Sequence, residues 1–460
     1  MKSMAKLNSL QKSALRKSSR EAVQKTFARL RRPMRRNKWL WEKNVYREKC
    51  IKTLWKHTQP GSSVNTNDLA DYIAASAALH CADGWGFLGR ALACHTYGDS
   101  DTARHLGYYA ELRAAMSLLA TEGIGIFDDR HFVVDLGNTC QPIGTLPKAK
   151  KRGWLGTHAI TWLALEHWTN RISSTDILAE IIQPAGIPLR DWLRTLSTGS
   201  SWRPIGSSWL KAWGLDLRRL TDDRDARNAA SYRPTHLNPV TSLDALSSSN
   251  FMRNLWEIFE PSAGSSFEIL DRHLLRLSLE VGFRAISDKK PELYPNEFAM
   301  TIRTVLNALA LSESSAQHWQ DFLTRKIEHS DPIIISEARQ SDKVTDPRHH
   351  IQVLSRATLL LRVATGACAQ LLRKTGFGNR DLEFWWKPFG VERGLWENGN
   401  EPMTLMDLWA DVEMALKETR EWEINNARKN PSFARWRRDK GHTIPILAEC
   451  ERIALWGLGL

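Results

Sequence analysis

The chain has 460 residues, of which 42% are apolar and 25% are charged, and this composition is typical of a globular protein and excludes a wholly disordered one. No apolar run approaches the roughly eighteen residues of a membrane span, and the N-terminus has no apolar core of a secretory signal. We therefore expect a soluble, cytoplasmic protein with no membrane partner.

The net charge of +13 is concentrated at the N-terminus. Residues 1–50 contain 16 basic and 3 acidic residues and so carry the whole net charge. Basic side chains next to tryptophans can neutralise phosphates and stack on bases. The predicted nucleic-acid-binding residues are Arg29, Arg31, Arg32, Arg35, Arg36, Lys38, Trp39 and Trp41. A solvated tail, a helix that docks on an acidic partner and a targeting sequence remain alternatives.

Helical spacing of Val23, Phe27 and Leu30 predicts a partly folded segment that Pro33 interrupts, and the pattern resumes over 39–55. The Pro-Gly-Ser stretch at 59–63 ends this region, so we expect a basic N-terminal arm over 1–60. Beyond it the sequence predicts helices over 67–94, 101–122, 157–170, 174–182 and 189–196.

The segment 101–135 is the most informative. Tyr108, Leu112, Ala115, Met116 and Leu119 recur at spacings of three and four and predict one apolar stripe on a long helix. Gly123 and Gly125 predict the stop of that helix, and a short extended run follows.

Two pieces of sequence resemble the HEPN superfamily. The first is YYAELRAAMSLLATEGI followed shortly by a histidine, and the second is ARNAASYRPTHLNPVTSLDA at 226–245, where an arginine precedes small residues, an aromatic and a turn. The resemblance covers roughly residues 70–262. It implies a bundle of four or five helices over 61–262 that binds or cleaves RNA, in a bacterial antiviral defence or toxin system.

Active HEPN ribonucleases carry an Arg and a His with four to six residues between them, and they use the ribose 2′-OH without metal. The resemblance places Arg227 at the Arg position and Tyr232 at the His position, with His131 as a further catalytic candidate. A tyrosine, with a pKa of about 10, is a poorer proton acceptor at neutral pH than a histidine at about 6.5. The alternative is that Arg227 pairs with Asp222 or Asp223, that Tyr232 caps the core, and that His131 begins a half-buried strand.

Residues 263–460 form a Trp-rich region for which we expect a second helical domain, so the predicted fold class is all-α. Helices are predicted over 267–287, 297–312, 317–329, 349–375, 405–426 and 445–456, and a strand over 332–336. Trp202 and the pair Trp385 and Trp386 are the tryptophans expected to meet a ligand or partner.

No P-loop, GxGxxG or GxSxG motif is present, and the six cysteines show no CxxC spacing. The sequence therefore indicates no cofactor, no metal and no disulfide framework. The resemblance favours a HEPN-like protein that acts on RNA rather than DNA. The protein is an enzyme, a metal-independent endoribonuclease, only if the matched site cleaves the RNA that it binds. The alternative is a non-catalytic helical adaptor that bridges nucleic acid and a protein, with a homodimer or protein partner on the Trp-rich body.

Overall fold

The protein is described from a computed structural model, which places residues 6–145, 155–197, 205–232, 244–262, 265–340, 346 and 348–459. Within these ranges the chain forms 21 α-helices, three short 3₁₀-helices and one three-stranded sheet, which confirms the predicted all-α class. None of the described helices has a stretch long and apolar enough to cross a membrane.

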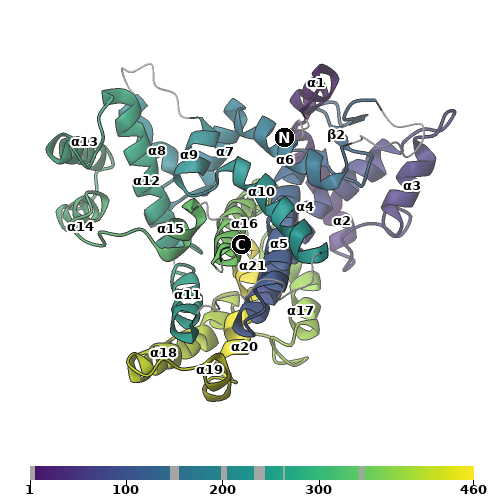
Figure 1. Ribbon diagram of the computed structural model, residues 1–460. Helices are drawn as coiled ribbons and strands as arrows, with labels where there is room; N and C mark the ends of the chain where they lie inside the picture. Colours follow the sequence, from purple (N-terminus) through teal and green to yellow (C-terminus); the bar gives the residue numbers. More distant parts are fainter. Residues whose placement is uncertain are drawn as a thin grey trace.

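Three long helices form the centre of the molecule (Figure 1): α4 (Thr66–Thr96), α5 (Ser100–Thr121) and α16 (His349–Lys374). Every residue of α16 from His349 to Leu372 is buried. A Cβ on Gly84 would lie 2.6 Å from a methyl carbon of Leu361 and 3.4 Å from the Ala110 carbonyl oxygen, so this glycine permits the close approach of all three helices.

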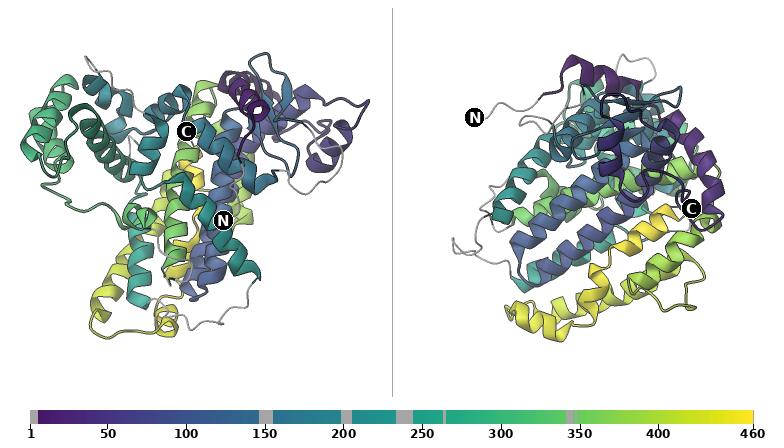
Figure 2. Two further views of the ribbon diagram at one scale, coloured as in Figure 1. Left: turned by 45° about the horizontal axis from the view of Figure 1, so that its top comes forward. Right: turned by 90° about the vertical axis from the view of Figure 1, so that its right-hand side faces the viewer.

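Helices α4 and α5 form an antiparallel hairpin and lie side by side in the right-hand view of Figure 2. Asn65 caps the start of α4 by accepting a hydrogen bond from the Asp68 amide, and Asp99 caps α5 in the same way from Thr102. Gly123, with φ at +77°, follows the end of α5. The predicted helix and its stop are confirmed, and the whole predicted apolar stripe of α5 is buried.

The N-terminal residues pack against this centre rather than standing apart from it. Val23, Phe27 and Leu30 are buried in the same apolar cluster as α4 and α16, so the helical spacing seen in the sequence marks a core-facing surface. The elements of this group are α1 (Ser9–Lys17), α2 (Arg20–Met34), α3 (Cys50–His57), β1 (Ile124–Gly125), β2 (Phe132–Val134) and β3 (Cys140–Pro142). The strands pair antiparallel in the order β1-β2-β3.

A second group of helices extends from above the centre, next to the N-terminal group, to the left of Figure 1. Its elements are α6 (Thr157–Thr169), α7 (Ile172–Ile181), η1 (Pro184–Gly186), α8 (Leu189–Ser197), α9 (Gly206–Ala212), α10 (Leu217–Tyr232), α12 (Glu268–Ser287), α13 (Pro295–Ala308), α14 (Glu313–Leu323) and α15 (Ile333–Arg339).

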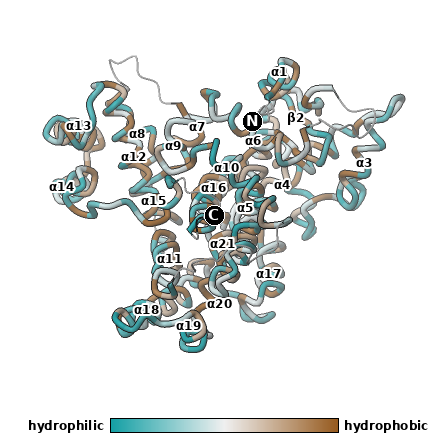
Figure 3. Tube along the Cα trace, viewed as in Figure 1, coloured by the Kyte–Doolittle hydropathy of each residue, from teal (hydrophilic) through white to brown (hydrophobic). Residues whose placement is uncertain are grey.

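The third group lies below the centre in Figure 1 and contains α11 (Ala245–Glu257), η2 (Asn379–Leu382), α17 (Glu383–Glu392), η3 (Leu405–Asp407), α18 (Leu408–Asn426), α19 (Phe433–Asp439), α20 (Thr443–Ala448) and α21 (Glu451–Leu458). The outward helices α3 and α18 are largely hydrophilic in Figure 3. Buried apolar side chains from Leu15 to Leu458 nevertheless form one continuous cluster that joins all three groups to the centre.

Three expectations are corrected. The strand predicted over 332–336 is wrong, because Pro332 precedes helix α15, whose Ile334 and Ile335 face the core. Trp385 and Trp386 are buried rather than presented. The helix predicted to resume at Trp39 begins only at Cys50, after a series of turns. The expectation for Trp202 lies outside the described residues.

Candidate functional site

Arg227 lies on α10, where this helix packs against α5 and α6 (Figure 1). Arg227 is only 8% exposed. The guanidinium carbon lies 5.3 Å from the ring centre of Tyr108 and 5.4 Å from that of Tyr109, and Nη2 donates to Nε2 of His158 at 3.1 Å. The arginine is therefore held by two aromatic faces and one imidazole.

The hydrogen bonds fix the tautomer of His158. Because Nε2 accepts from Arg227, the proton of the neutral ring is on Nδ1, which donates to the Tyr108 hydroxyl oxygen at 2.9 Å. That oxygen also accepts from Nε1 of Trp162 at 3.3 Å. Burial, Arg227 and Arg224 lower the pKa of His158, so the ring is neutral at pH 7.

A second imidazole lies beside Arg227. Nδ1 of His105 is 2.9 Å from Oγ of Ser231, and this hydroxyl donates to the backbone oxygen of Arg227 at 2.9 Å. His105 Nδ1 therefore carries the proton, and Nε2 keeps its lone pair. Burial and the charge of Arg227 lower the pKa of His105. The half-buried ring thus presents a neutral base next to a cation.

A buried ion pair fixes α10 in this position. Nε and Nη2 of Arg356, on α16, donate to the two carboxylate oxygens of Asp223, both at 2.7 Å. Oε1 of Glu111 on α5 is 3.8 Å from Nε of the same arginine. Burial and the charge of Asp223 raise the pKa of Glu111 well above its usual range, so Glu111 is the protonated member of the group.

Asp223 forms its ion pair with Arg356, and the expectation that Arg227 pairs with Asp222 or Asp223 is wrong. Among the residues that the structure describes, no carboxylate lies within ion-pair distance of Arg227, and its Nε has no acceptor. A buried cation normally has a counter-charge. Arg227 therefore has the capacity to bind an anion.

The structure does not join Arg227 to the other two predicted catalytic residues. Tyr232 lies five positions later on the same helix, about 140° round its axis, and is 82% exposed, so it caps no core. Nδ1 of His131 accepts from the Phe127 amide at 3.1 Å, and Nε2 bonds the Leu155 carbonyl at 2.9 Å. Both nitrogens of His131 are engaged, and burial lowers its pKa to about 4. His131 therefore ties two loops together.

The predicted nucleic-acid-binding residues divide into engaged and exposed ones. Arg29 pairs with Asp71 at 2.7 Å, Arg31 donates to the carbonyls of Thr375 and Gly376, and Lys38 pairs with Glu42.

The remaining cations, Arg32, Arg35 and Arg36, are exposed near the end of α2. Arg36 lies over the ring of Trp41, with 5.2 Å to its centre, and Trp39 is half-buried against Phe384 and Trp385. Only part of the predicted basic surface is free to meet phosphates.

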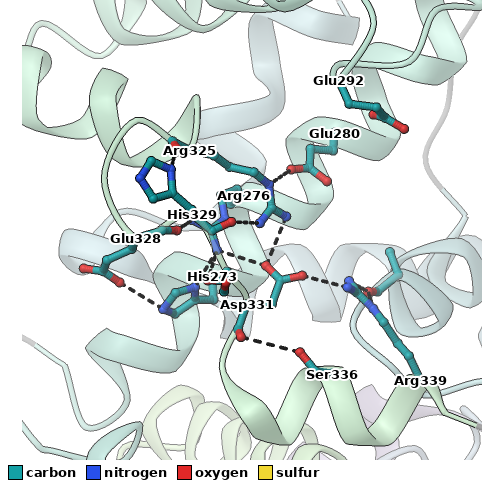
Figure 4. Close-up of polar contacts among 12 residues, drawn as sticks. His273, Arg276, Glu280, Glu292, Arg325, Glu328, His329, Asp331, Ser336 and Arg339 are labelled. Carbon is teal, nitrogen blue, oxygen red and sulfur yellow. Dashed lines mark hydrogen bonds and ion pairs between the residues drawn. The ribbon is translucent and has the colours of Figure 1, made fainter.

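Another dense group of charges surrounds Asp331 (Figure 4). Asp331 accepts from Arg276, Arg325 and Arg339, at 2.9, 3.0 and 2.7 Å. Burial by itself would raise the pKa of Asp331, but these three cations hold it below its usual range. The group joins α12 to α15, and each of the three arginines bonds Asp331 directly, so we assign it a structural role.

Sequence reasoning missed His105 and His158. Both come from helices far from Arg227 in the chain, and His105 has no distinguishing spacing. His158 follows Arg152 at the spacing of the HEPN motif, but His95 and His442 also follow an arginine at that spacing, so it does not single out His158. In the described part of the chain, no group of three His, Cys, Asp or Glu side chains is placed to hold a metal. Comparison of the chain with family models, curated proteins and solved structures finds no match.

Proposed function

We propose that the protein binds RNA through Arg227 and cleaves it without metal, as a HEPN-like endoribonuclease. The observation that carries the proposal is a nearly buried arginine that has no carboxylate partner among the described residues and lies beside two neutral histidines. An arginine in that setting favours a phosphate, since guanidinium geometry matches phosphate oxygens.

In this proposal His105 is the general base. Its Nε2 takes the proton of a ribose 2′-OH, the 2′-oxygen bonds to the adjacent phosphorus, and the bond to the 5′-oxygen of the next nucleotide breaks. Water supplies the proton that the departing 5′-oxygen needs, and the products carry a 2′,3′-cyclic phosphate and a 5′-OH. Arg227 stabilises the extra negative charge on the five-coordinate phosphorus, and His158 positions Arg227.

The exposed cations Arg32, Arg35 and Arg36 support the same proposal as an electrostatic contact to the RNA backbone. They lie apart from Arg227 in the chain and contribute affinity without sequence preference.

The test is incubation of the purified protein with labelled single-stranded RNA and DNA in EDTA. We expect RNA cleavage that leaves a cyclic phosphate, no DNA cleavage, and loss of cleavage in Arg227→Ala and His105→Ala. Arg303→Ala, an exposed arginine on α13, is the matched control and should cut normally. A requirement for magnesium, or equal action on DNA, would overturn the mechanism because DNA lacks the 2′-OH.

The pH profile separates a base from a merely structural histidine. Since burial and Arg227 lower the pKa of His105 below its usual 6.5, cleavage should be constant from pH 7 to 8 and should fall as the pH drops through that lowered pKa. If RNA binds at Arg227 but is never cut, the result would favour the alternative function, a non-catalytic helical adaptor that bridges nucleic acid and a protein.

A further inference from the structure

A hollow of about 460 Å³ opens between the turns that follow α2, over 38–47, and helices α4 and α5. Its apolar wall includes the side chains of Trp39, Tyr72 and Leu79, and three cations line it: Lys38, Arg47 and Arg113. The volume is in the range of about 300–1,000 Å³ that small-molecule sites occupy.

The lining fits a flat, anionic ligand. Aromatic faces bind a nucleobase by stacking. Each of the three cations has a carboxylate partner: Lys38 pairs with Glu42, Arg47 with Glu48 at 3.9 Å and Arg113 with Asp83 at 3.7 Å. These pairs are about a third or more exposed, and exposed ion pairs are weak, so a phosphate can replace the carboxylates. Nε1 of Trp39 is buried and has no acceptor among the described residues. Nη1 of Arg113 is 2.7 Å from Nδ1 of His80, which holds this guanidinium at the hollow.

The hollow and the Arg227 site lie on one stripe of α5. His105, Tyr109 and Arg113 are spaced by four residues, so they share a face of the helix, and His105 is about 12 Å from Arg113 along the axis. Between them Tyr109 stacks on Phe87 of α4, with 5.5 Å between ring centres and 25° between planes. Both of these rings are partly exposed.

We propose that the hollow binds one unstacked base of a single RNA strand whose backbone continues along α5 to Arg227. This inference rests on the proposed function and adds the substrate class. A base in a duplex is paired and stacked and cannot enter the hollow, whereas single-stranded regions present bases that stack on aromatic side chains. Arg47, Lys38 and Arg113 then contact the phosphates on either side of this base.

The test measures binding of a labelled single-stranded RNA by fluorescence anisotropy in EDTA. Ser76 lines the hollow from α4, so Ser76→Trp fills it, and Ser76→Ala is the matched control. We expect at least a tenfold loss of affinity in Ser76→Trp and none in Ser76→Ala. Arg47→Glu, at an exposed position, tests the same site without filling it and should also lose at least tenfold.

Competition with duplex RNA and with AMP identifies the source of the base. We expect the single strand to compete at least tenfold better than either. Equal competition by AMP would overturn the inference in favour of a free nucleotide, and equal competition by the duplex would overturn the unstacked base. If Arg227→Ala loses RNA binding while Ser76→Trp and Arg47→Glu keep it, the role of the hollow in RNA binding is refuted and the proposed function stands. If Ser76→Trp and Arg47→Glu lose RNA binding while Arg227→Ala keeps it, the proposed function is refuted.

Discussion

Replacing Glu111 by Gln removes a titratable group from the buried network that holds α10 in place. Glu111 is fully buried between Asp223 and Arg356, and its pKa is raised well above 4.5 by burial and by the charge of Asp223. The carboxyl is therefore protonated in the folded protein. The amide of Gln has the same shape as the protonated carboxyl and, like it, carries a hydrogen that can be donated, so below pH 5 the substitution should change the free energy of unfolding by no more than about 1 kcal/mol.

The two proteins should diverge as the pH rises. The folded state holds a proton on Glu111 that the unfolded chain releases above about pH 4.5, so this contribution to stability is complete below that pH and is lost as the pH approaches the folded pKa. The slope is about 1.4 kcal/mol per pH unit over the interval in which Glu111 stays protonated. Glu111→Gln has no such slope and should become the more stable protein at neutral pH.

The assay is urea unfolding followed by circular dichroism at pH 5, 6, 7 and 8, with Glu413→Gln, an exposed glutamate of α18, as the control. A Glu111→Gln variant that is destabilised by several kcal/mol at pH 7 would refute the reasoning, because it would mean that Glu111 is ionised and pairs with Arg356. A stability difference that does not vary with pH would refute it too.

Three further predictions concern other parts of the chain. Met116→Asp places an unpaired carboxylate on the buried stripe of α5 and should cost several kcal/mol, measured by thermal unfolding; a normal melting temperature would contradict the packing. Replacing Arg32, Arg35 and Arg36 together by Gln should leave folding intact and should weaken RNA binding at least tenfold at low salt, with a flatter salt dependence in anisotropy titrations. His131→Phe breaks two hydrogen bonds and should lower stability by about 1–3 kcal/mol in urea; we expect RNA cleavage per folded molecule to be unchanged, and its specific loss would restore the catalytic role.

The helices could be predicted because their signals are local. The apolar spacing of α5 and its glycine stop are properties of adjacent turns, and the structure confirms both. The strand predicted after Pro332 was wrong because its structure depends on a non-local contact. A run of three isoleucines suits a strand, but here the segment packs against α16 as a helix.

The site could be predicted only in part because its contacts join distant segments. Arg227 was singled out by the resemblance of its local sequence, but its neighbours His158 and His105 lie on α6 and α5, far from it in the chain. Charge composition had the same limit. It marked the basic N-terminus, but only the fold separates Arg31, which bonds backbone carbonyls, from the exposed Arg32.

The central claim is that Arg227 is a phosphate contact, and the salt dependence of single-stranded RNA binding tests it most directly. We predict that Arg227→Gln, at an unchanged melting temperature, weakens binding at least tenfold and lowers the slope of log K against log salt by about 0.7, the value of one phosphate contact on a single strand. Arg303→Gln should change neither quantity. Equal affinity and equal slope in Arg227→Gln and the unmodified protein would contradict the account.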